Sequence, residues 1–154
     1  MRLNIVDKAV LWQTKGWYFL PHLILSIFSL EIPKEVIFRQ IGGGDSAHFV
    51  HRAPGTVFHP NTIIGRRVQI YQGVTLGKAK PWDGSLKNGS VEIMDDVILC
   101  AGAKILFKNE KLIVGKGTVI GANSVLTTST GEYEIWAGIP ARKIGERKNN
   151  DINK

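Results

Sequence analysis

The chain has few sulfur-containing residues and no long apolar run. Among its 154 residues there are two methionines and a single cysteine, Cys100. One cysteine excludes an intramolecular disulfide and is typical of a reducing compartment, so we expect a cytoplasmic protein. The strongest apolar run, residues 17–30, is broken by Pro21 and His22. It is shorter than the roughly 20 residues that a bilayer-spanning helix needs, and no signal-peptide cleavage site follows it, so neither is favoured.

Acidic residues are also scarce. There are 13 of them against 20 basic residues, which gives a formal net charge of +7. This excess favours an anionic partner, such as a nucleic acid, a membrane surface or a phosphorylated cofactor. The basic residues are dispersed and lack interleaved aromatic residues, so nucleic acid is disfavoured. The histidines lack ligand-like spacing with other donors, so we expect no metal.

Residues 1–30 are expected to form a short helical segment that lies outside the rest of the pattern. Two interpretations of it remain open. Its helices could pack across the first part of the domain and a neighbouring subunit. Alternatively, they could lie on the inner face of a membrane, with Arg2, Lys8 and Lys15 towards the headgroups and the aromatic face inserted.

An apolar residue recurs every six positions over most of the chain. The members of this series are Phe58, Ile64, Ile70, Leu76, Ile93, Leu99, Ile105, Val114, Ile120 and Leu126. A period of six fits neither an α-helix nor a two-sided strand, but it fits a chain that turns a corner every six residues, three times per coil. Stacked coils pair through parallel strands and bury one continuous core. The pattern predicts an all-β solenoid over residues 31–130.

The six-residue count fails at three places. It fails at residues 48–57, beside His48 and His51, where we expect a site. It fails again after Gly77, where residues 78–92 are polar and rich in turn-forming residues. We expect these to form a loop extruded from a corner, since such loops tend to carry binding surfaces. A shorter break at 107–112 predicts a bulge, and residues 131–154 should form a cap and tail.

Three strings together carry a resemblance to a known family. They are QIYQGVTLG at 69–77, AGAKIL at 101–106 and AGIPAR at 137–142. The chain resembles the serine O-acetyltransferases, and more closely the short serine-acetyltransferase-like O-acetyltransferases of bacterial capsule, exopolysaccharide and lipopolysaccharide genes. The resemblance implies a left-handed parallel β-helix, a homotrimer, and acetyl-CoA as co-substrate without a metal.

The resemblance also implies a general base. In the family a histidine lies on the coil before the Gln-x-Val-Thr-Leu-Gly string, and here that histidine is His51. A neutral imidazole can take the proton of an acceptor hydroxyl as the oxygen attacks a thioester. Glu31 falls at the position of the aspartate that orients this histidine in the serine enzymes, and Asp45 is the alternative.

The resemblance places acetyl-CoA in a groove between adjacent solenoids. The residues implied are Lys78, Ala101, Gly102, Gly121, Ala122, Arg142 and Lys143. The backbone amides of Lys78 and Ala101 would stabilise the oxyanion of the tetrahedral intermediate. Arg142 and Lys143 would meet the cofactor phosphates, although a solvated cap is the alternative for both.

The extruded loop departs from the serine enzymes, which carry Asp-Arg-His-Pro there. This chain has Trp82, Asp83 and Asn88 instead, which disfavours serine as the acceptor. We expect a sugar hydroxyl of a bacterial surface polysaccharide or its precursor, with Trp82 stacking on the sugar and His59 and Asn88 lining the site. Acetylation of a small molecule, such as serine or an amino sugar, and a non-catalytic scaffold remain alternatives.

Overall fold

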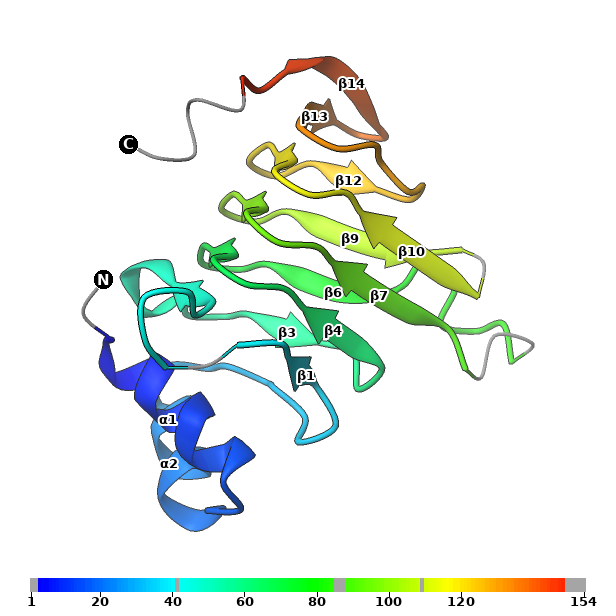
Figure 1. The fold of residues 1–154 in the computed structure, drawn as a ribbon. Helices are drawn as coiled ribbons and strands as arrows, with labels where there is room; N and C mark the ends of the chain where they lie inside the picture. The colour runs from blue at the N-terminus through cyan, green and yellow to red at the C-terminus, as the bar shows by residue number, and fades with distance from the viewer. Residues whose placement is uncertain (1–2, 41, 85–87, 109, 149–154) are drawn as a thin grey trace.

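The computed structural model describes residues 3–40, 42–84, 88–108 and 110–148. Arg2, the middle of the predicted loop and most of the predicted tail lie outside these ranges. Two helices, α1 (Ile5–Thr14) and α2 (Phe19–Ile27), precede a stack of short strands. As Figure 1 shows, the helices cover the N-terminal end of the stack.

The strands form three sheets, which we number by their order along the chain. Sheet 1 contains β1 (Ile37–Phe38), β4 (Thr62–Ile64), β7 (Ser90–Ile93) and β10 (Lys111–Val114). Sheet 2 contains β2 (His48–Phe49), β5 (Gln69–Ile70), β8 (Ile98–Leu99), β11 (Val119–Ile120), β13 (Glu134–Gly138) and β14 (Ala141–Glu146). Sheet 3 contains β3 (Val57–Phe58), β6 (Thr75–Lys78), β9 (Lys104–Phe107) and β12 (Val125–Leu126).

From β1 to β12 the chain visits the three sheets in rotation, so each coil contributes one strand to each sheet, and β13 and β14 then both add to sheet 2. All the strand pairs within the sheets are parallel except β13 with β14. As the chain rises in Figure 1, the far strands of sheet 3 run left to right and the near strands of sheet 1 run right to left. That is the sense of a left-handed coil, as the family resemblance implied.

The six-residue series forms the core of the solenoid. Each of its members is at most 2% exposed. Fully burying a side chain of this size contributes about 1.5–3 kcal/mol relative to leaving it in water. Stacking follows the register, since Phe58 lies opposite Leu76 and Ile64 lies opposite Ile93. The prediction of a hexapeptide-repeat solenoid is confirmed.

Two of the three interruptions of the repeat, those predicted at residues 78–92 and 107–112, fall at one corner, between sheet 3 and sheet 1. β6 ends at Lys78 and β7 begins at Ser90, so the extruded loop is shorter than the predicted 78–92. Its ends join paired strands, because Lys78 lies opposite Phe107 and Ser90 lies opposite Lys111. The second break lies at the same corner, between β9 and β10. The loop therefore leaves the core stack intact.

Helix α1 begins with a capping box, in which Asn4 and Asp7 satisfy each other's backbone amides. Its buried face joins that of α2 and the first coils in one hydrophobic cluster. The predicted packing of the N-terminal helices on the first coil is therefore confirmed. The outer face of α2 leaves Phe19 86% and Ile27 68% exposed. Membrane contact stays a prediction, and none of the helices in the described ranges is long and apolar enough to cross a bilayer.

Candidate functional site

A left-handed turn follows β2 at the place where the repeat count fails. Three consecutive residues have positive φ angles, namely His51 (53°), Arg52 (66°) and Ala53 (42°). Left-handed backbone costs an L-residue about 1–2 kcal/mol. Such strain persists only where the surrounding structure enforces it, and it clusters at functional sites. The turn therefore marks a candidate site.

His51 and Arg52 line a pocket of about 430 Å³ together with Asn4 and His48. The edge of the His51 ring faces Tyr71, with ring centroids 6.2 Å apart. The Arg52 guanidinium lies 5.6 Å above the ring of Phe28. Both His51 and Arg52 are exposed, and neither has an acidic partner in the part of the chain that the structure describes. The turn therefore presents an imidazole and an unneutralised cation to the same pocket.

His48, by contrast, has a carboxylate partner. Its Nδ1 lies 2.9 Å from Oδ2 of Asp7, whose side chain is 2% exposed. The backbone amides of Asn4 and Phe49 also donate to this carboxylate, each at 2.9 Å. The sequence reasoning missed Asp7. The spacing of Asn4 and Asp7 is a helix-start signal, but nothing local to it indicates a contact with a strand 41 residues away.

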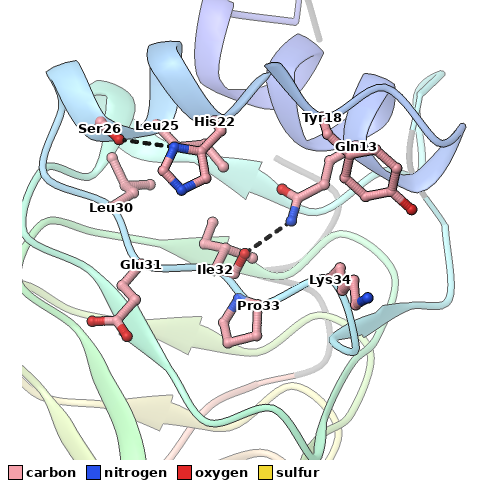
Figure 2. A pocket seen from close by; sticks show the side chains of 10 residues that line it. All are labelled: Gln13, Tyr18, His22, Leu25, Ser26, Leu30, Glu31, Ile32, Pro33 and Lys34. Atoms are coloured by element: carbon pink, nitrogen blue, oxygen red, sulfur yellow. Dashed lines mark hydrogen bonds between the residues drawn. The ribbon is translucent and has the colours of Figure 1, made fainter. Parts of the chain in front are cut away.

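The carboxylates predicted to orient His51 lie elsewhere. Glu31 lines a separate pocket of about 550 Å³ beneath α2, and its side chain points away from His22 and Gln13 (Figure 2). Its backbone is held there by a bridge to Val57. Oδ1 of Asp45 lies 3.0 Å from the Arg67 guanidinium. No hydrogen bond or ion pair joins either residue to His51 within the described ranges, so this prediction is corrected.

Four predicted cofactor residues lie on the corner turns between sheets 2 and 3. They are Ala101, Gly102, Gly121 and Ala122. The turns stack on the coil that carries Tyr71, since the Tyr71 amide donates to Leu99 and the Cys100 amide donates to Ile120. Because Tyr71 also contacts the His51 ring, His51 lies at the lower end of this column of turns. Burial raises the pKa of the Cys100 thiol, which disfavours a thiolate nucleophile.

Arg142 and Lys143 lie on β14, above the last of these turns. β13 rests on β11, and Ala137 of β13 pairs with Arg142. The Lys143 ammonium contacts Glu146 at 2.8 Å and Glu134 at 3.1 Å, and these bonds raise its pKa. The Arg142 guanidinium donates to the Ala141 carbonyl and has no acidic partner among the described residues. Arg142 is therefore better placed than Lys143 to bind an anion.

The other predicted residues gather at the corner between sheets 3 and 1. Lys78 ends β6, and the His59 ring packs edge-on against Phe107 with centroids 5.1 Å apart. Burial lowers the pKa of His59, and the charge of Lys78 lowers it further. Trp82 is 79% exposed on the loop, and Asn88 is exposed near its end.

The predicted site residues therefore form two groups at two corners of one solenoid. Figure 1 shows the loop corner and the corner above residues 50–53 at opposite edges of the coils. A single chain does not bring Lys78, Trp82 or Asn88 to His51. No group of three potential metal ligands is found in the described ranges.

The repeat, the three parallel sheets and the hand of the coil define the class: a hexapeptide-repeat protein of the left-handed parallel β-helix type. No protein-family model matches the chain. Within this class the chain is similar to serine acetyltransferases. It is 31% identical to a serine acetyltransferase of Bacillus subtilis over 147 residues, which is 90% of this chain and 62% of the relative. It is 32% identical to one of Buchnera aphidicola over 146 residues, 93% of this chain and 52% of the relative.

Solved structures give the same result. A serine acetyltransferase from Vibrio cholerae superimposes with a TM-score of 0.72 and 26% identity, over 94% of this chain and 53% of that one. A serine acetyltransferase in complex with CoA superimposes with a TM-score of 0.65 and 28% identity, over 90% of this chain and 54% of that one. The chain spans roughly half the length of most of the relatives that it matches.

Proposed function

We propose that the chain transfers an acetyl group from acetyl-CoA to the hydroxyl of a small acceptor, with His51 as the general base. The observation that carries this proposal is the exposed His51 imidazole, held on a strained turn at the end of the column of corner turns. The similarity to serine acetyltransferases, one of them solved with CoA, supports acetyl-CoA as the donor. The reaction would then take place in the cytoplasm, where acetyl-CoA is available.

In the proposed reaction, the His51 imidazole accepts the proton of the hydroxyl as its oxygen attacks the thioester carbonyl. The tetrahedral intermediate then collapses, the carbon–sulfur bond breaks, and the proton passes to the departing CoA thiol. The Ala101 amide has no hydrogen-bond partner among the described residues, so it is free to donate to the oxyanion. Lys78, the second predicted donor, lies at the other corner.

This division of the site supports a homotrimer. If adjacent solenoids lie side by side, the Lys78 corner of one chain can face the His51 corner of its neighbour, and the groove between them can hold acetyl-CoA. Gly102, Gly121 and Ala122 would then present backbone and small side chains to the cofactor. Arg142, at the upper end of the column, would bind its phosphates, because a guanidinium suits phosphate geometry.

The similarity to serine acetyltransferases favours serine, the alternative acceptor given above, over a sugar. The relatives cited above are named serine acetyltransferases. The extruded loop of this chain lacks the arginine and histidine of the serine enzymes, but Arg52 offers a cation without an acidic partner in the described part of the site. Placed beside His51, it can bind the carboxylate of serine.

A sugar hydroxyl remains the second candidate. The observation that favours it is the indole of Trp82, which is 79% exposed on the loop and could stack on a sugar ring. A non-catalytic scaffold would leave the strained His51 turn without a role.

The test is a thiol-release assay with purified protein, acetyl-CoA and a panel of serine, hexosamines and oligosaccharides. We expect serine to accelerate CoA release well above the acceptor-free rate. Acceleration by sugars alone would select the second candidate. CoA release that no acceptor increases would overturn the proposed function.

A further inference from the structure

Two histidines of this chain share one pocket, but they differ in their partners. His48 and His51 both line it with Asn4 and Arg52. His48 is bound to the Asp7 carboxylate, whereas His51 has no carboxylate partner among the residues that the structure describes. The proposed reaction uses only His51, so the Asp7–His48 pair has no role in it yet.

The Asp7 carboxylate holds the His48 ring in one orientation. It is buried and fixed by the backbone amides of Asn4 and Phe49, one from the helix start and one from β2. An ionised carboxylate only accepts hydrogen bonds, so Nδ1 of His48 must donate to it. In the neutral ring this leaves Nε2 as an acceptor with a free lone pair.

Nε2 of His48 is available to a ligand. It has no hydrogen-bond partner in the described part of the chain, and the side chain is 18% exposed where it lines the pocket. Asn4, which also lines the pocket, is fixed by a 2.7 Å bond from its amide to the Phe49 carbonyl. Hydrogen bonds therefore hold both side chains on this side of the pocket, and Nε2 of His48 is the acceptor left without a partner in the described ranges.

We propose that His48, oriented by Asp7, binds a second hydrogen-bond donor on the acceptor molecule while His51 deprotonates the reacting hydroxyl. This inference rests on the proposed function and specifies the substrate class: a β-amino alcohol or a vicinal diol, with a donor next to the reacting hydroxyl. Arg52 at the same pocket adds a preference for an acceptor that also carries an anionic group. Asp7 is the positioning residue, and His48 contacts the substrate.

The test compares two acceptors in each variant. Serine carries the second donor, and 3-hydroxypropionate lacks it. The measured quantity is the ratio of kcat/KM for serine to that for 3-hydroxypropionate, which does not depend on the fraction of folded protein. We expect Asp7→Asn and His48→Gln each to lower this ratio about tenfold, since one hydrogen bond to the substrate is lost. If the wild-type protein prefers a sugar, the two acceptors compared are that sugar and an analogue that lacks the hydroxyl next to the reacting one.

His22→Gln is the matched control, because His22 is exposed on α2, lies outside the pocket of His48 and His51, and within the described ranges its ring forms a hydrogen bond only with Ser26, at 3.3 Å. Its ratio should equal that of the wild type. An active wild type whose ratio is unchanged in both the Asp7 and His48 variants would overturn this inference and leave the proposed function standing. A wild type that transfers acetyl to neither class of acceptor would overturn both.

Discussion

His51 shows how a single residue can be held in a costly backbone conformation that also exposes its ring. Its φ of 53° and those of the next two residues turn the chain sharply out of β2. The ring then rests against Tyr71 of the next coil rather than entering the core. The turn therefore fixes the position of the imidazole while leaving it open to solvent.

The first prediction concerns this imidazole. We expect His51→Ala to lower kcat for acetyl transfer by about 10² or more, because a positioned general base typically contributes that much. The side chain is exposed, so its loss should change thermal stability little. Steady-state thiol release and a thermal melt measure the two effects. Wild-type turnover in this variant would remove His51 from the mechanism.

The second prediction concerns pH and His59. Because burial and Lys78 lower the pKa of His59 below its ordinary 6.5, the unfolded chain binds a proton more readily than the folded one. This contribution to stability is fully present above about pH 6.5 and is lost as the pH falls through the lower pKa of the folded state. His59→Gln should therefore reduce the loss of stability on acidification from about pH 7.5 to 5.5.

Urea unfolding at the two pH values measures this change, and His22→Gln serves as the control because His22 is an exposed histidine. The control should keep the pH dependence of the wild type. An equal loss of stability in wild type and His59→Gln would contradict the assignment to His59.

For single residues, the sequence identifies those marked by the six-residue repeat or by a break in it. It misses residues whose contacts join segments far apart in the chain. The irregular backbone at His51 could be predicted because the six-residue count fails beside it. Asp7 could not, because its contact with His48 joins a helix start to a strand 41 residues away. Glu31 was assigned by motif position, but the bridge to Val57 and the pocket beneath α2 hold it away from His51.

The repeat places a glycine after several of its buried residues, but these glycines differ in how much space a side chain would have. Gly65 and Gly77 each follow a buried residue of the series, Gly65 directly after β4 and Gly77 next to last in β6. A Cβ at Gly65 would come within 2.7 Å of backbone and side-chain atoms of Met94 and Asp95. A Cβ at Gly77 would meet nothing within 4 Å. The same sequence position is therefore crowded at one corner and open at another.

The third prediction follows from this difference. We expect Gly65→Ala to destabilise the protein by about 1–3 kcal/mol, because the clash is with the backbone of the next coil. Gly77→Ala should change stability by less than about 0.5 kcal/mol. Urea unfolding of both variants measures the difference. Equal effects would show that the coils can shift apart at the first corner.

The period predicts strands, corners and the loop because each is a local consequence of burying one side chain in six. It does not predict the helix ends. α1 and α2 are separated by residues 15–18, where Gly16 has a φ of 87°, and a count of one buried residue in six carries no information on that break. The hand of the coil likewise came from family resemblance, not from the period.

At the scale of the whole molecule, the predicted site residues lie at two separate corners, so under the proposed function each chain would contribute to two shared sites. The fourth prediction is that the active species contains three chains. Light scattering should give a mass of about three times 17.0 kDa for the protein in active fractions. Full activity in fractions whose mass is that of one chain would contradict the shared site.

The hairpin of β13 and β14 has one more consequence. Every other strand in the stack runs parallel to its neighbours, but β14 reverses direction, and it places exposed Arg142, Lys143 and Glu146 on the final rung. A further strand therefore cannot continue the parallel ladder, and exposed charged side chains on an edge strand disfavour edge-to-edge pairing. With helices over the opposite end, both ends of the described solenoid disfavour stacking into end-to-end fibrils.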